Sequence, residues 1–82
     1  DLIVTSDISV YPNPTYGAIT LTSSQIILSY DIINTQGDIL SFEKDVNLKE
    51  VDIDISGLSS GLYVLRIQTL RGYVTRKLVV LD

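Results

Sequence analysis

The amino-acid sequence predicts an all-β domain, built as an antiparallel β-sandwich of about seven short strands. Its apolar and polar residues alternate in short runs, so that every second side chain lies on one face of an extended strand. Turn-forming Gly, Pro, Asn and Ser residues separate these runs about every 8–12 residues, the spacing typical of a sandwich. No run of about ten residues shows the apolar spacing of a helix. These observations exclude a helical fold.

The first half of the chain contains a hairpin and two further predicted strands. Residues 1–7 are expected to be a lead-in or linker, and residues 8–82 to form a single domain. Pro12 and Pro14 end the first strand because proline lacks the N–H donor of a strand ladder. Asn34 and Gly37 predict the hairpin turn, in which Gly takes a left-handed conformation. The strands are predicted over residues 8–11, 18–22, 26–34 and 39–44, with a polar connection at residues 23–25.

The second half is organised around a turn rich in Asp, Ser and Gly. The side-chain oxygens of Asp54 and Ser56 suit a tight turn because they accept hydrogen bonds from nearby backbone N–H groups. Gly57 and Gly61 let the chain reverse, and Leu58 between them is expected to plug the end of the core. Strands are predicted over residues 51–55, 62–69 and 73–81, after an acidic connector at residues 45–50. The predicted core comprises Leu28, Tyr30, Ile32, Ile53, Leu58, Tyr63, Leu65 and Ile67.

The composition argues against an enzyme. The chain of 82 residues has no His and no Cys, which removes the commonest general base, thiolate nucleophiles and the usual transition-metal ligands. No base accompanies the serines at positions 56, 59 and 60 to activate them. Asp52 and Asp54 lie on the outward face of one predicted strand, where acids usually serve solvation. We therefore expect no catalytic residue, no metal and no cofactor.

A calcium site is the alternative left open for the acidic connector. Oxygen ligands are dense in residues 45–54, and hard cations prefer such ligands. Their spacing matches no EF-hand loop, and the Gly of that turn is missing. The stretch therefore allows only a weak loop site, formed from Asp45, Asn47, Glu50, Asp52 and Asp54.

Charge is distributed unevenly along the chain. Residues 1–54 carry a net charge of −7 and residues 55–82 one of +3. The acidic part argues against nucleic-acid binding, and no apolar run reaches the roughly 18 residues that cross a bilayer. The N-terminus lacks the basic region of a signal peptide, and a start at Asp1 is expected of a fragment or a processed product. The basic residues of the last two strands are expected to be solvated, with an anionic partner as the alternative.

Four motifs give the chain a resemblance to a known family. They are VYPNPTYG at residues 10–17, IINTQGDIL at 32–40, DISGLSSGLYVLRI at 54–67 and TRKLVV at 75–80. In this order and spacing they resemble the type A C-terminal sorting domain of the type IX secretion system. Asp38 stands where the family usually has Lys, Arg or Gln, and Asp82 adds an acid at the end. The signature residues are Pro12, Asn13, Pro14, Gly17, Asn34, Gly37, Asp54, Ser56, Leu58, Gly61, Tyr63, Arg76 and Lys77.

The resemblance implies an immunoglobulin-like sandwich and a role in protein transport. Such a domain directs the cargo upstream of it through the outer-membrane type IX translocon, and a sortase-like surface peptidase generally removes it. The implied partners are the secretion machinery, that peptidase and the N-terminal cargo domains, and we expect a monomer. The implied location is the periplasm in transit to the outer-membrane surface or the extracellular space.

Two other functions share the predicted fold. A glycan-binding accessory module would need exposed aromatic rings, but Tyr30 and Tyr63 fall on inward faces and Tyr11 and Tyr16 flank the proline turn. Trp, the usual sugar-stacking residue, is absent. A passive spacer in a secreted multidomain enzyme or adhesin would need no recognition surface at all.

Overall fold

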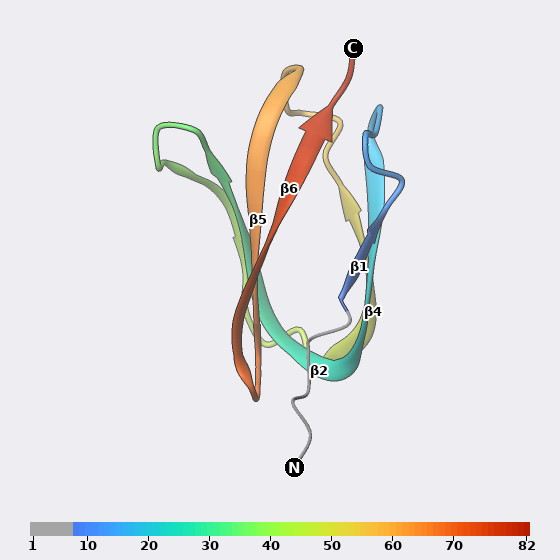
Figure 1. Ribbon diagram of the computed structural model, residues 1–82, viewed down its shortest axis with the longest axis vertical. Helices are drawn as coiled ribbons and strands as arrows, with labels where there is room; N and C mark the ends of the chain where they lie inside the picture. Colours follow the sequence, from blue (N-terminus) through green and yellow to red (C-terminus); the bar gives the residue numbers. More distant parts are fainter. Residues whose placement is uncertain (1–7) are drawn as a thin grey trace.

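Residues 8–82 are described by a computed structural model, and they form a single antiparallel β-sheet that curls upon itself (Figure 1). The predicted lead-in at residues 1–7 lies outside the described residues. Within residues 8–82 no helix is long and apolar enough to cross a membrane. The strands are β1 (Ser9–Tyr11), β2 (Ala18–Asn34), β3 (Ile39–Glu43), β4 (Leu48–Asp54), β5 (Gly61–Thr69) and β6 (Gly72–Val80).

Strand β2 connects the two halves of the curled sheet. Its first part pairs with β1 and β4, and its second part pairs with β3 and β5. Strand β6 then pairs along the other side of β5. Because β2 bends between these two sets of partners, the β1–β2–β4 half faces the β3–β2–β5–β6 half (Figure 1). The predicted all-β antiparallel sandwich is confirmed.

The predicted break within β2 is wrong. Residues 23–25 were expected to connect two strands, but the chain stays extended across them, so six strands replace the expected seven. The polar residues mark a bend: the pairing with β4 shifts register between Thr22 and Ile27, where β2 passes from one half to the other. Locally, the hydroxyl of Ser23 accepts a hydrogen bond from the backbone N–H of Gln25 at 3.0 Å.

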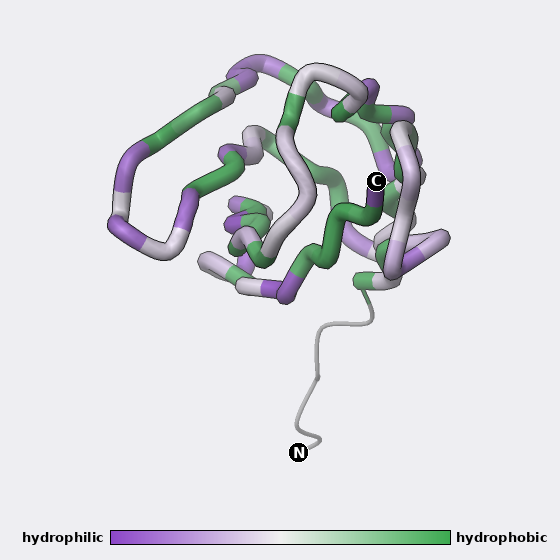
Figure 2. The backbone as a smooth tube through the Cα atoms, turned by 90° about the horizontal axis from the view of Figure 1, so that it is seen from above, coloured by the Kyte–Doolittle hydropathy of each residue, from purple (hydrophilic) through white to green (hydrophobic). Residues whose placement is uncertain are grey.

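Apolar side chains from both halves form one core between them. Of the predicted core residues, Tyr30, Ile32, Ile53, Tyr63, Leu65 and Ile67 are buried. The same core contains Ile8, Ile19, Leu21, Ile27, Ile55, Leu78 and Val80. Seen from above, the backbone of the sheet curves around so that its two halves face each other (Figure 2). Burial on alternate residues of β5 follows directly from the period-2 pattern.

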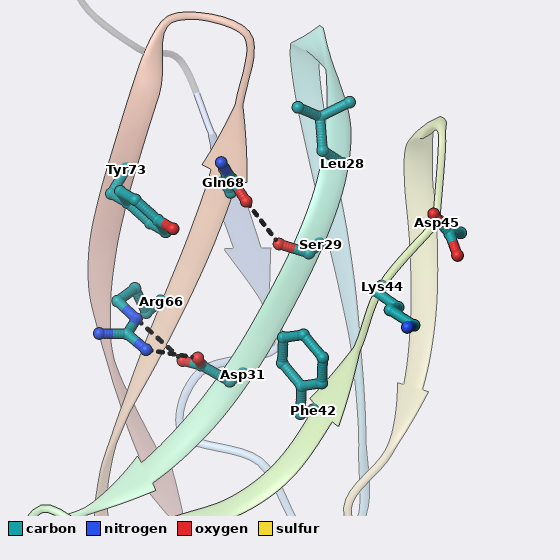
Figure 3. A pocket seen from close by; sticks show the side chains of 9 residues that line it. All are labelled: Leu28, Ser29, Asp31, Phe42, Lys44, Asp45, Arg66, Gln68 and Tyr73. Atoms are coloured by element: carbon teal, nitrogen blue, oxygen red, sulfur yellow. Dashed lines mark hydrogen bonds and ion pairs between the residues drawn. The ribbon is translucent and has the colours of Figure 1, made fainter.

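The prediction that Leu28 lies in the core is wrong. A β-bulge between Ile27 and Ser29 interrupts the pairing of β2 with β5 and exchanges the two faces of the strand at that point. Ile27 is therefore fully buried, whereas Leu28 is half-buried and lies beside Ser29 on the outer face (Figure 3). The carbonyl oxygen of Leu28 accepts a hydrogen bond from the N–H of Val46 at 3.0 Å, which holds the bulge against the β3–β4 connection.

Candidate functional site

The four sequence motifs meet at one end of the curled sheet, which we call the motif end. It consists of the β1–β2 turn at residues 12–17, the β2–β3 turn at 34–38, the β4–β5 loop at 55–60 and the last residues of β6. In Figure 1 these segments lie at the top, beside the C-terminus. A parallel bridge between Thr15 and Val80 joins the first motif to the fourth. The bend within β2 and the β5–β6 turn lie at the opposite end of the sheet.

Asn13 completes the free edge of β6 with its side chain. Its amide nitrogen donates a hydrogen bond to the carbonyl of Lys77 at 2.7 Å, and its amide oxygen accepts one from the N–H of Val79 at 3.0 Å. The backbone of Thr15 continues this pairing, since its N–H donates to Val79 and its carbonyl accepts from Leu81. The proline-bounded turn therefore acts as a short extra strand on β6.

Thr15 and Gly17 connect this turn to the neighbouring loop. The hydroxyl of Thr15, which is buried, donates to the carbonyl of Ala18 at 2.7 Å and accepts from the N–H of Gly17 at 3.3 Å. The carbonyl of Gly17 accepts a hydrogen bond from the N–H of Ile55 at 2.9 Å. Gly17 is not among the residues with positive φ, so its place here depends on neighbours and not on backbone conformation.

Asp54 opens the β4–β5 loop as the sequence predicts. Its carboxylate oxygen accepts a hydrogen bond from the N–H of Ser56 at 2.9 Å. Hydrogen bonds from the backbone and then the side chain of Ser56 hold the pKa of Asp54 below its usual value. This bond thus favours the folded state above the unfolded-state pKa of Asp54, and its contribution is lost as the pH falls through the lower folded-state pKa. Asp54 is therefore a turn-forming residue.

Tyr63 closes the same loop from inside. Its ring is buried in the core, and its hydroxyl donates to the carbonyl of Ser59 at 2.6 Å and lies 3.3 Å from the Ser59 hydroxyl. Leu58 was predicted to be buried in the core, but it is only half-buried. Its side chain packs against the edge of the core from the loop. The signature tyrosine thus anchors the loop to the sheet, and it does not present a ring to solvent.

Gly61 begins β5 with a φ of 152°, a conformation that side chains with a Cβ rarely adopt. We expect Gly61→Val to lower the free energy of unfolding by about 1–3 kcal/mol, because a β-branched residue is strained there. Gly57→Ala is the matched control, since a Cβ at Gly57 meets no atom within 4 Å and its φ is not positive. Urea unfolding of both variants makes the comparison, and equal stabilities would contradict the assigned role of Gly61.

Asn34 builds the β2–β3 turn almost alone. Its side-chain oxygen accepts from the N–H groups of Gln36 and Asp38, each at 2.9 Å, and its amide nitrogen lies 3.3 Å from the Asp38 carboxylate. Gly37 has a φ of 91°, so the left-handed turn glycine predicted from the sequence is confirmed. Asp38, which departs from the family pattern, is thereby tied into the turn.

A groove of about 450 Å³ separates this turn from the β4–β5 loop; we call it the end groove. Two large apolar side chains on its lining are substantially exposed, Leu40 at 44% and Leu62 at 46%. The lining residues are Asn34, Thr35, Gln36, Leu40, Ser59, Ser60, Gly61, Leu62 and Tyr63. The end groove is therefore an accessible surface in which residues of the second and third motifs meet.

Arg76 and Lys77 do not act as the pair of solvated charges that the sequence suggests. Arg76 is opposite Leu65 in the β5–β6 register, so it projects on the core side of β6 and is half-buried. Its guanidinium donates to the carbonyl of Ile8 at 3.3 Å and thereby links β6 to the start of β1. Lys77 is exposed on the other face, and its carbonyl holds Asn13.

Asp52 and Ser59, which carry oxygens considered in the sequence analysis, both make contacts within the domain. Within residues 8–82 no three acidic side chains come close enough together to hold a metal ion, and the oxygens of the acidic connector are dispersed. Asp52, for example, accepts a hydrogen bond from the Thr20 hydroxyl at 2.7 Å. The Ser59 hydroxyl faces the phenol of Tyr63.

The structure thus defines a small all-β domain, a curled antiparallel sheet whose sequence motifs gather around one end. The chain belongs to the family of secretion system C-terminal sorting domains, whose model matches residues 9–81. It is a C-terminal sorting signal of the type IX secretion system, and it marks its protein for export to the cell surface or the extracellular space.

A solved structure shows the same fold. PorZ of Porphyromonas gingivalis, described as an essential bacterial surface component of the type IX secretion system, superposes with a TM-score of 0.72 at 21% sequence identity. The match covers 93% of this chain but 12% of PorZ, so the domain corresponds to a small part of that protein. No curated protein sequence matches the chain.

Proposed function

We propose that the type IX machinery recognises this domain through its motif end. In this proposal the domain follows its cargo into the periplasm, the machinery binds it there, and the cargo passes the outer-membrane translocon. A sortase-like surface peptidase then separates domain and cargo. The supporting observation is that four motifs spread over the chain, from residue 10 to residue 80, adjoin one another at one end.

The proposal divides the signature residues into two groups. Asn13, Asn34, Asp54 and Tyr63 hold backbone segments in place through their side chains. They shape the surface and do not need to touch a partner. The end groove supplies the contacts, because it combines exposed apolar side chains with hydroxyl and amide groups, as a protein interface does.

The other expectations about partners and activity belong to the same proposal. The domain acts as a monomer without catalytic activity, it does not insert into membranes, and it does not bind nucleic acid. Its net charge of −4 disfavours polyanions. The sorting role of the family is consistent with a domain that works by being bound.

The first test is a fusion of residues 1–82 behind a periplasmic reporter, in a bacterium that exports its own type A cargo. We expect the reporter at the cell surface or in the medium, and mass spectrometry of the exported reporter should show that the domain has been removed. Retention of the intact fusion in the periplasm would contradict the sorting role. Export with the domain still attached would contradict the proposed cleavage alone.

The second test addresses the surface. Leu40→Glu and Leu62→Glu place a charge in the end groove at side chains that are already exposed. We expect export to fall by about tenfold or more, as loss of a central apolar interface contact implies. Leu48→Glu and Leu70→Glu are matched controls, since these residues are 53% and 77% exposed and lie outside the end groove.

All four variants should melt close to the parent protein, because substitutions at exposed positions change stability by about 0.5 kcal/mol or less. Equal export by groove and control variants would overturn the proposed surface. The export of Lys77→Ala and of Arg76→Ala should be measured separately. Only Lys77 is exposed, whereas Arg76 is half-buried and donates a hydrogen bond to the carbonyl of Ile8.

A further inference from the structure

A second concave surface lies on the outer face of the β3–β2–β5–β6 half, apart from the motif end. It is a hollow of about 290 Å³, which we call the outer hollow. Its floor consists of polar side chains from β2 and β5, and exposed aromatic rings from β3 and β6 stand on either side of it (Figure 3). The floor residues are Ser29, Asp31, Arg66 and Gln68, and the rings are those of Phe42 and Tyr73.

The floor is held rigidly by hydrogen bonds. Arg66 donates from Nη2 to one Asp31 carboxylate oxygen at 2.7 Å and from Nε to the other at 3.2 Å. The Asp31 side chain is only 7% exposed, so this bidentate pair sits at the bottom of the hollow. Beside it, the Ser29 hydroxyl donates to the amide oxygen of Gln68 at 3.0 Å. Arg66 Nη1 and Gln68 Nε2 take no part in these hydrogen bonds.

The walls of the outer hollow are aromatic rings that lie outside the hydrophobic core. Phe42 is 54% exposed and Tyr73 is 64% exposed, and both project away from the buried side of the sheet. The guanidinium carbon of Arg66 lies 5.6 Å from the centre of the Tyr73 ring, which keeps that ring beside the floor. Exposed rings on both sides of a polar floor provide apolar faces for a ligand at low conformational cost.

The strand register places these side chains in rows across the sheet. Phe42 is opposite Asp31, which is opposite Arg66, so these side chains form one row across three strands. Gln68 is opposite both Ser29 and Tyr73 and forms the next row. The hollow is therefore prebuilt by the central part of the sheet, and binding would need little reorganisation.

The charges of the outer hollow cancel. Asp31 and Arg66 neutralise each other in the floor, and Lys44 and Asp45 place one charge of each sign at the rim. A strongly charged ligand therefore gains little there. The hollow suits a neutral ligand with apolar faces and several hydroxyl groups at its edge, and its size is at the lower end of ligand pockets, roughly 300–1,000 Å³.

We propose that the outer hollow binds a neutral saccharide. A pyranose ring would lay a C–H face against Tyr73 or Phe42, while its hydroxyls accept hydrogen bonds from Arg66 Nη1 and Gln68 Nε2. This activity is separate from the sorting role, because it uses the outer face of the sheet and none of the motif end. It also differs from a site at Tyr11 and Tyr16, which flank the proline turn at the motif end.

The test is an NMR titration of the 15N-labelled 82-residue chain. The probes are glucose, galactose, mannose and their disaccharides, with glucuronic acid and glucosamine as charged counterparts. We expect saturable shifts for at least one neutral sugar, confined to amides near residues 29–31, 42–45, 66–68 and 73, and weaker binding of the charged sugars. Absence of saturable shifts with every neutral sugar, or shifts that map outside the hollow, would overturn the proposal.

Variants then identify the contacts. Tyr73→Ala should weaken binding of that sugar by about tenfold, and Gln68→Ala by about fivefold, in keeping with loss of one stacked ring or one hydrogen bond. Tyr16→Ala is the matched control, because Tyr16 is an exposed tyrosine that does not line the hollow, and it should bind as the parent does. Circular dichroism should show that all three variants stay folded. Parent-like binding by Tyr73→Ala, or an equal loss in Tyr16→Ala, would contradict the assigned site.

Discussion

Leu65→Ala is expected to lower the free energy of unfolding by about 3–5 kcal/mol, the range for large cavities in a core. Leu65 has no exposed surface, and it lies in the middle of β5 between β2 and β6. Its neighbours belong to rigid strands, so the cavity can collapse only partly. A domain of this size has about 4–12 kcal/mol of stability in total, and the variant should therefore be largely unfolded at 37 °C or close to it.

Urea unfolding followed by circular dichroism measures this effect. Leu70→Ala is the control, because Leu70 is highly exposed in the β5–β6 turn and should change stability by about 0.5 kcal/mol or less. In the reporter fusion, Leu65→Ala should also abolish export, since no motif end exists without the sheet. A loss below about 1 kcal/mol would contradict the central place of Leu65 in the core.

The double variant Asn13→Ala, Thr15→Val is expected to lower the free energy of unfolding by about 2–4 kcal/mol. Asn13 loses hydrogen bonds to the carbonyl of Lys77 and the N–H of Val79. Thr15 loses the bond from its hydroxyl to the carbonyl of Ala18, and the N–H of Gly17 loses the same hydroxyl as its acceptor. Each net hydrogen bond contributes about 0.5–1.5 kcal/mol, so the loss of these bonds together accounts for the expected range.

Hydrogen exchange locates the damage in this variant. The amides of Val79 and Leu81 donate hydrogen bonds to Asn13 and Thr15, so they should exchange faster than in the parent. The amides in the middle of β5 should keep the same ranking of protection factors among themselves. Asn13→Asp should have an intermediate effect, because a carboxylate still accepts from Val79 but does not donate to Lys77. Unchanged exchange at Val79 would contradict the assignment of Asn13 as the partner of β6.

The β1–β2 turn explains how the domain protects one of its edges. An unpaired strand edge invites other strands to pair with it, and proteins usually cover such edges. Here Asn13 and Thr15 occupy the last part of the β6 edge. The Pro-Asn-Pro signature therefore has a structural role, because it ties the beginning of the domain to its end.

Alternation in the sequence was sufficient to predict most of the strands. Residues on a β-strand point to opposite faces in turn, so the pattern of β5 reveals both the strand and its buried residues, Tyr63, Leu65 and Ile67. Local turn chemistry was equally readable, since Asn34, Gly37 and Asp54 act on atoms within a few residues of themselves. The same local order carried the family resemblance, which the family match confirms.

The sequence alone therefore determined most of the strands, the turns and the family, because each depends on residues near one another in the chain. Tertiary structure decided what residues far apart do together. The bend of β2 is imposed by partners on both sides of it, and the bulge at Leu28 depends on pairing with β5. Arg76 faces the core side because of its register with Leu65. Asn13 forms a hydrogen bond with Lys77 in β6, which is 64 residues further along the chain. Such contacts follow from strand pairing across the whole sheet, which period-2 patterns do not specify.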